Sequence, residues 1–235
     1  MSGYTRQFGP LQWEYQEYEG TALTDGVKNV LLGHPTISPQ VLNGIFDNTV
    51  TSSLHVIGSS AGVERTVMIP IGDRAAPAAG DPVFMGQFPQ KDYKMEGDGL
   101  VHATINWGAW STEADSLLYD QPWGLLLLAK SAKTAANSAT GAGIDNAASS
   151  ALGGYMVYQV FSGDGTATVS IDDSADDSSY SALSGATSGE IDFSTPTAGL
   201  VALGKTATVR RYLRWQLSLN TASSVTFALA FVRGR

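Results

Sequence analysis

The chain has 235 residues, of which 43% are hydrophobic, and it carries 14 Lys or Arg against 22 Asp or Glu, for a formal net charge of −8. This hydrophobic share excludes a wholly disordered chain. The acidic balance argues against a protein that grips nucleic acid, which would neutralise phosphates with clustered Lys and Arg. The absence of cysteine excludes disulfides, thiolate catalysis and cysteine-based zinc sites.

Two further features of the composition limit the class of protein. The longest apolar run, Leu125–Ala129, is far too short for a membrane helix, and the start, Met1–Gln7, lacks the apolar stretch of a signal peptide. Only 15% of the residues are charged, with small residues in their place. We therefore expect no membrane association and a surface that partners cover in an assembly.

A stretch of small residues, 131–154, divides the chain and is typical of a linker. We expect a boundary near 140–150, with one domain over residues 1–140 and a second over residues 141–235. Residues 1–140 hold 8 basic and 14 acidic residues and thus carry −6 of the net charge of −8.

The second domain has the clearer pattern. Four runs are aromatic and β-branched or alternate between apolar and polar residues, and turn-rich clusters separate them: Tyr155–Phe161, Thr166–Ile171, Leu213–Leu219 and Val225–Phe231. These runs predict a small antiparallel β-sandwich, either immunoglobulin-like or jelly-roll-like.

The first domain is also predicted to be mostly β. Strands are expected at Leu11–Tyr15, Thr66–Ile71 and Val101–Trp107, and eight scattered prolines argue against long helices. The segment Leu125–Asn137 fits a helix, whereas a buried strand at Leu125–Leu128 fits equally well. The fold class is therefore all-β with at most one or two short helices.

One string matches a catalytic motif. Gly58–Gly62 reads Gly-x-Ser-x-Gly, which would make Ser60 the nucleophile of a hydrolase. That motif needs a helix directly after the serine, yet a strand is expected here, so a hairpin loop of small residues is the better interpretation. The histidines His34, His55 and His102 do not have the spacing of a zinc pair.

Two charged clusters remain. Asp172, Asp173, Asp176 and Asp177 lack the glycine and the distal glutamate of a calcium loop, so a solvated turn is favoured over an ion site. The second cluster is basic and flanks Tyr212: Arg210, Arg211 and Arg214. These arginines, with Tyr212 and Trp215, could stack on a sugar or a base, but ion pairs with nearby aspartates are favoured.

The tryptophans are expected in the core rather than on ligand platforms; they are Trp13, Trp107, Trp110, Trp123 and Trp215. Taken together, these residues lead us to expect no catalytic residue, no cofactor and no metal, and therefore no enzyme.

Several strings carry a family resemblance. In the C-terminal part they are a Ser-Ala-Asp-x-Ser-x-Tyr turn within Val169–Leu183, Arg-Arg-Tyr-Leu-Arg within Thr208–Trp215, and the apolar run Ser224–Phe231. These resemble the C-terminal module of tailed-phage virion proteins. Upstream, three segments are similar to phage major tail (tail tube) proteins: Glu64–Gly72, Gly80–Phe84 and Asp98–Ile105.

The resemblance implies a tail-tube-like β-sandwich or barrel followed by an outer β-sandwich. It implies that copies form rings, typically hexameric, which stack into a conduit for genome ejection in the virion tail after assembly in the host cytoplasm. The implied partners are the chain itself, the tape measure, the tail terminator and the distal tail protein. DNA passes through without specific binding.

The first domain offers candidates for the lining of such a conduit, because an acidic bore repels phosphate. They are Glu14, Glu17, Glu19 and Asp25. The segments Asp73–Pro82 and Phe88–Gly99 are expected to be loops that either join successive rings or lie at the surface. The alternative function is a capsid or tail decoration protein or a glycan-binding adhesion module, which would employ Trp215 and Tyr212.

Overall fold

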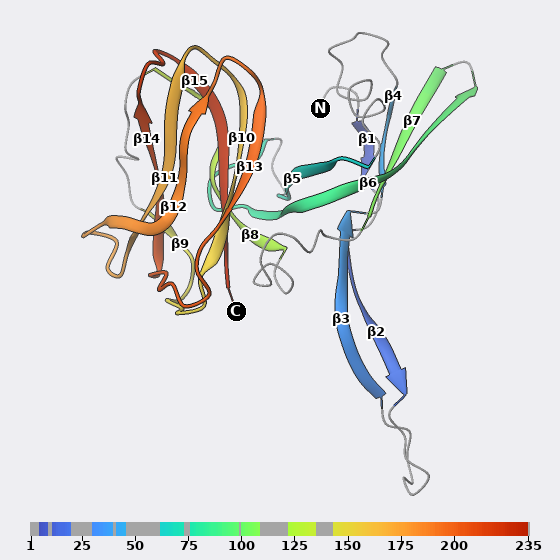
Figure 1. Cartoon of the computed structure of the whole chain (residues 1–235), viewed down its shortest axis with the longest axis horizontal. Helices are drawn as coiled ribbons and strands as arrows, with labels where there is room; N and C mark the ends of the chain where they lie inside the picture. The colour runs from blue at the N-terminus through green and yellow to red at the C-terminus, as the bar shows by residue number, and fades with distance from the viewer. Residues whose placement is uncertain are drawn as a thin grey trace, which may run out of the picture. The chain divides into compact units, whose positions relative to one another are not determined.

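The computed structural model describes residues 5–8, 11–19, 30–39, 41–45, 62–72, 76–98, 100–108, 122–134 and 143–234. Every regular element in these ranges is a β-strand, and no helix occurs among them (Figure 1). The predicted all-β class is therefore confirmed. None of the described residues belongs to a helix that could cross a membrane.

Backbone contacts group the chain into two compact units. The N-terminal unit comprises residues 1–65 and 87–111, and the C-terminal unit comprises residues 66–86 and 112–235. The segments 66–86 and 112–140 thus group with the C-terminal half, although the sequence placed them before the expected boundary. Separate domains over 1–140 and 141–235 remain a prediction.

The N-terminal unit contains an antiparallel sheet and a hairpin. The sheet has the strand order β1-β4-β7-β6, and β2 and β3 pair only with each other (Figure 1). The bounds are β1 Thr5–Phe8, β2 Leu11–Glu19, β3 Val30–Pro39, β4 Val41–Ile45, β6 Pro82–Asp98 and β7 Leu100–Trp107. The strands predicted at Leu11–Tyr15 and Val101–Trp107 are both present.

The strand β6 corrects one prediction, because Phe88–Gly99 was expected to be a loop. Residues 90–98 instead pair with β7 over their whole length. Alternation explains the strand: Asp92, Lys94 and Glu96 lie opposite polar partners on β7, whereas Tyr93 lies opposite Ile105. The charges mark the polar face of an amphipathic strand and not a loop.

The C-terminal unit contains a β-sandwich of eight strands. Its two sheets have the orders β8-β15-β10-β13 and β12-β11-β14-β9, with all neighbours antiparallel. The first residues of β6, Pro82–Phe84, belong to this unit and pair with β8. The bounds are β8 Trp123–Lys133, β9 Ile144–Asp145, β10 Gly154–Gly163, β11 Thr166–Ser174, β12 Ser181–Asp192, β13 Thr197–Ala202, β14 Tyr212–Leu219 and β15 Val225–Arg233.

Counted from the first strand of the sandwich, the sheets read 1-8-3-6 and 2-7-4-5. This interleaving of eight strands defines a jelly roll, so the structure decides between the two sandwich types that the sequence left open. The small-residue stretch 131–154 contains the end of β8 and all of β9, which lie in different sheets, and is therefore a crossing within the jelly roll.

The strand β8 also settles the helix-or-strand question for Leu125–Asn137. Leu126, Leu127 and Leu128 are all buried, so both faces of this strand are covered. Such a strand has a continuous apolar run without alternation, which is why the sequence could not separate it from a helix. On the outer face of its sheet, the hydroxyl of buried Tyr155 donates to the carbonyl of Met85, 3.2 Å away.

The core between the two sheets is aromatic and aliphatic. Phe227 lies at its centre, with edge-to-face contacts to Phe193 and Trp215 at centroid distances of 6.2 and 6.1 Å. Leu213, Trp215 and Leu217 of β14 point into this core. The alternation that predicted the strand thus also identified its buried face.

Candidate functional site

The described residues hold no cluster of His, Asp or Glu that could bind a metal ion. Ser60 and His55 lie outside the described residues, as do the side chains of His34 and His102. After Gly62 the chain enters β5 (Glu64–Pro70). A strand therefore follows the Gly-x-Ser-x-Gly string, as predicted.

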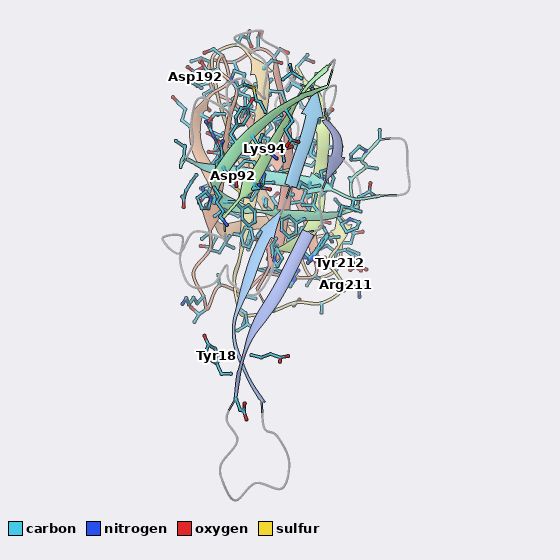
Figure 2. The ribbon with its side chains drawn as sticks, turned by 90° about the vertical axis from the view of Figure 1, so that its right-hand side faces the viewer. Tyr18, Asp92, Lys94, Asp192, Arg211 and Tyr212 are labelled. Atoms are coloured by element: carbon cyan, nitrogen blue, oxygen red, sulfur yellow. The ribbon has the colours of Figure 1, made fainter. Side chains whose placement is uncertain are left out.

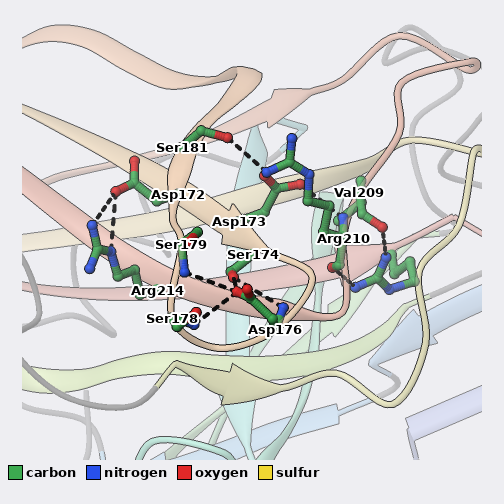
Figure 3. A network of polar contacts seen from close by, with 11 residues as sticks. Asp172, Asp173, Ser174, Asp176, Ser178, Ser179, Ser181, Val209, Arg210 and Arg214 are labelled. Carbon is green, nitrogen blue, oxygen red and sulfur yellow. Dashed lines mark hydrogen bonds and ion pairs between the residues drawn. The ribbon is translucent and has the colours of Figure 1, made fainter.

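The arginines at the start of β14 form ion pairs, as predicted. Arg211 makes two hydrogen bonds to the carboxylate of Asp145, at 2.8 and 2.6 Å. Arg214 donates from Nε and Nη2 to Asp172, at 3.2 and 2.9 Å (Figure 3). Each guanidinium also lies over a tyrosine ring, Arg211 over Tyr212 and Arg214 over Tyr180. These arginines tie strands of one sheet together.

The third arginine joins a hydrogen-bond network at the same end of the sheet (Figure 3). The backbone N–H of Arg210 donates to buried Asp173 at 2.8 Å, and its side chain donates to Ser181 at 3.0 Å. Arg233 donates to the carbonyls of Val209 and Arg210. The network fixes the segment before β14.

The prediction of a solvated turn holds for only part of the acidic cluster. Asp172 and Asp173 are buried at the end of β11, whereas Asp176 and Asp177 lie in the turn after it. Asp176 accepts from the backbone N–H groups of Ser178 and Ser179 and from the hydroxyl of Ser174 (Figure 3). These hydrogen bonds hold the pKa of Asp176 well below its usual value, and the bond from the N–H of Ser179 has the largest effect. Asp176 thus caps its own turn.

The neighbouring aspartate is engaged as well. Asp177 accepts from the backbone N–H of Gly143 at 2.6 Å and from the hydroxyl of Tyr180. Burial, and then the bond to Asp177, raise the pKa of Tyr180 to about 12. The turn is therefore fastened to the crossing between β8 and β9.

Asp176 leads to a prediction about acid stability. Because its pKa is lower in the folded chain than in the unfolded one, its contribution to stability is present above about pH 4 and is lost as the pH falls through the folded pKa. Asp176→Asn should therefore show a smaller drop in melting temperature between about pH 6 and about pH 2.5 than the wild type. Equal drops in calorimetry would contradict the assignment.

The tryptophans divide between core and surface. Trp107 and Trp215 are 7% and 9% exposed, as expected of core residues, whereas Trp123 is 37% exposed and contacts Phe84 edge to face. Trp13 and Trp110 carry no described side chain. Burial of Trp215 removes it as a ligand platform.

The acidic candidates for a channel lining lie around one hairpin. Glu17 and Glu19 are exposed on β2 and lie opposite Leu32 and Val30 of β3. Between them Tyr18 is 55% exposed (Figure 2). Glu14 lies opposite Thr36 in the same strand pair, but its side chain is outside the described part, as is all of Asp25. Whether these acids line a channel remains a prediction.

The N-terminal sheet has two strand edges without a described partner. β1 pairs only with β4. β5 lies along β6 from Pro82 to Gln90, as the bonds Ile71 N–H to Pro82 and Gly62 N–H to Gln90 show. Beyond Gln90, β6 has β7 on one side and no described strand on the other. Figure 2 marks Asp92 and Lys94 on this edge segment. The sequence did not indicate this edge, because Phe88–Gly99 was expected to be a loop.

No family model matches the chain, and no curated protein matches it. Among solved structures it is similar to the Dit protein of phage SPP1, described as a paradigm of the hub adsorption apparatus in phages that infect Gram-positive bacteria. The identity is 9% and the TM-score 0.29, over 98% of this chain and 93% of that one.

A second similar structure is the phage P2 baseplate in its activated conformation with Ca, at 9% identity and a TM-score of 0.32, over 96% of this chain and 89% of that one. Both are phage baseplate or hub proteins. At this level of identity and superposition, the likeness defines neither a shared fold nor a shared function.

Proposed function

We propose that the chain is a non-enzymatic structural subunit of a phage tail that assembles with copies of itself through its N-terminal sheet. The observation that carries this proposal is that two edges of that sheet have no partner strand among the described residues, β1 on one side and β6 beyond Gln90 on the other. Unpaired strand edges are templates for another chain, and monomeric proteins usually block them.

Two different edges on one sheet suit a cyclic assembly. If β1 of one copy pairs with β6 of the next, the contact is head to tail, and a closed ring uses every edge. The finer proposal, which rests on the resemblance of the sequence to tail tube proteins, is that such rings are hexameric and stack into the tail tube. The tape measure, tail terminator and distal tail proteins would be its partners in the virion.

The jelly roll is less suited to this pairing. Its edge strand β12 pairs with β11 through two irregularities, next to Gly185 and Gly189, whose φ angles are +83° and +67°. Bulges of this kind twist an edge away from further strands. We therefore assign self-assembly to the N-terminal unit and an outer position to the jelly roll.

The acidic hairpin fits a conduit through which DNA passes without being held. The carboxylates of Glu17 and Glu19 are exposed on β2. A lining of carboxylates repels phosphate, whereas each Lys or Arg contact would retain it. An imaged ring with these acids on its outer wall would refute this part of the proposal.

The assembly proposal predicts opposite effects of proline at two adjacent positions. Successive backbone N–H groups of a strand point to opposite edges, so only one of Lys94 and Met95 directs its N–H toward β7. In Lys94→Pro and Met95→Pro, one variant should lose a bond to β7 and become less stable. The other should fold like the wild type yet form no rings, because proline is tolerated only where the N–H is unpaired.

The readouts are negative-stain electron microscopy and sedimentation for assembly, and circular dichroism for folding. The wild type should form rings or hollow filaments of uniform diameter at high concentration. A wild type that remains monomeric at every concentration, or two proline variants that both assemble, would contradict the proposal. A decoration or adhesion protein, the alternative function, would stay a monomer or trimer.

A further inference from the structure

The outer face of the sheet β12-β11-β14 is polar along its whole length. Register places Glu190, Thr168 and Ser218 side by side in one row across the three strands. The next row holds Thr187, Ser170 and Gln216, and the row after it holds Ala182, Asp172 and Arg214. We call these nine residues the polar face.

The polar face is the solvated side of an antiparallel sheet. It contains hydroxyls, a carboxamide, carboxylates and one guanidinium, but no lysine and no bulky apolar side chain. Protein interfaces have a buried aromatic or aliphatic anchor at their centre, which the polar face lacks. A protein partner is therefore not the ligand that it fits.

Cross-strand hydrogen bonds hold the larger side chains in place. Asp172 accepts from Gln216 and from two nitrogens of Arg214, and the guanidinium of Arg214 also lies 4.2 Å from the ring centroid of Tyr180. At the other end Asn220 donates to Thr168 at 3.3 Å and to Glu190 at 2.9 Å. Side chains fixed in this way lose little conformational entropy when they bind a ligand.

Polar atoms remain available between these fixed points. Three of them make no hydrogen bond within the described part of the chain: Nη1 of Arg214, Oε1 of Gln216 and the hydroxyl of Ser170. They provide donors and acceptors on adjacent strands about 5 Å apart. Vicinal hydroxyls of a sugar ring, each both donor and acceptor, match such an arrangement.

The charge of the polar face narrows the ligand class. Arg214 is neutralised by Asp172, at 2.9 Å, which leaves Glu190 and neighbouring Asp192 as exposed negative charges. Phosphate, sulfate and carboxylate groups are repelled by such a surface. We propose that the polar face of the jelly roll binds a neutral saccharide, independently of whether the chain forms rings.

The experiment is an NMR titration of the full ¹⁵N-labelled chain with the methyl glycosides of glucose, galactose and N-acetylglucosamine. At least one should shift the side-chain amide signals of Gln216 and Asn220 in a saturable way, with a Kd on the order of millimolar, as for a small ligand on an open surface. Gln216→Ala should weaken binding about tenfold, since it removes a hydrogen-bonding group.

Two further variants make the result decisive. Ser170→Gln places a longer side chain in the middle of the polar face, keeps all the fixed hydrogen bonds, and should abolish binding. Gln159→Ala on β10 of the other sheet is the matched control and should bind like the wild type. The proposal is wrong if no glycoside shifts these signals, or if Gln216→Ala and Gln159→Ala bind equally well. It is also wrong if a sulfated heparin fragment binds more tightly than every neutral glycoside.

Discussion

Replacing Phe227 by Ala is expected to lower the free energy of unfolding of the C-terminal unit by about 4 kcal/mol. Phe227 is fully buried and contacts Phe193 and Trp215 edge to face, so its loss leaves a cavity between the two sheets and breaks two aromatic pairs. Since a domain has only about 5–15 kcal/mol of stability, the variant should be partly unfolded at elevated temperature.

Phe161→Ala is the matched control for this prediction. Phe161 lies on β10 of the same sheet, is only half-buried and has Lys130 over its ring. It should lose about 1 kcal/mol, because less apolar surface leaves the interior. Hydrogen exchange of the amides of β10 and β15, measured by mass spectrometry, reports on this unit alone. Equal protection in the two variants would show that Phe227 is not at the centre of the core.

The sequence predicted the strands of the jelly roll because one face of each is buried and the other is polar. In β14, Leu213, Trp215 and Leu217 alternate with Arg214 and Gln216, and this alternation is a local property. The order of the strands is not local. β8 pairs with β15, which lies about 100 residues further along the chain, and no residue pattern in either strand indicates that it pairs with the other.

The alternative that the sequence left open at β8 and the wrong prediction at β6 have different physical causes. The strand β8 is buried on both faces and thus lacks the alternation that identifies a strand. The strand β6 has its alternation, but its charged residues Lys91, Asp92 and Lys94 are also typical of a surface loop. For β6 the period of two, and not the composition, identifies the strand, whereas the buried leucines of β8 follow no such period.

For the charged residues, the sequence predicted the kind of interaction but not the partners. Arg211 and Arg214 form the expected ion pairs, yet Asp145 and Asp172 lie 66 and 42 residues away along the chain. The polar face could not be predicted at all. It exists because three strands align Thr168, Ser170 and their neighbours in register, which only the fold determines.

Replacing Gly124 by Ala is expected to destabilise the C-terminal unit by about 3 kcal/mol, the upper end of the usual cost of overpacking. A Cβ at this position would overlap the carbonyl oxygen of Phe231 and lie 2.8 Å from its carbonyl carbon. These are backbone atoms of β15, which pairs with β8 on one side and with β10 on the other, so they cannot move without breaking hydrogen bonds in the middle of the sheet.

Gly204→Ala is the control, because a Cβ at Gly204 meets no atom within 4 Å. It should leave the melting temperature nearly unchanged, whereas Gly124→Ala should lower it by on the order of 10 °C. Calorimetry of both variants measures the difference directly. If the two melt together, β8 and β15 are not packed as closely as the structure has them.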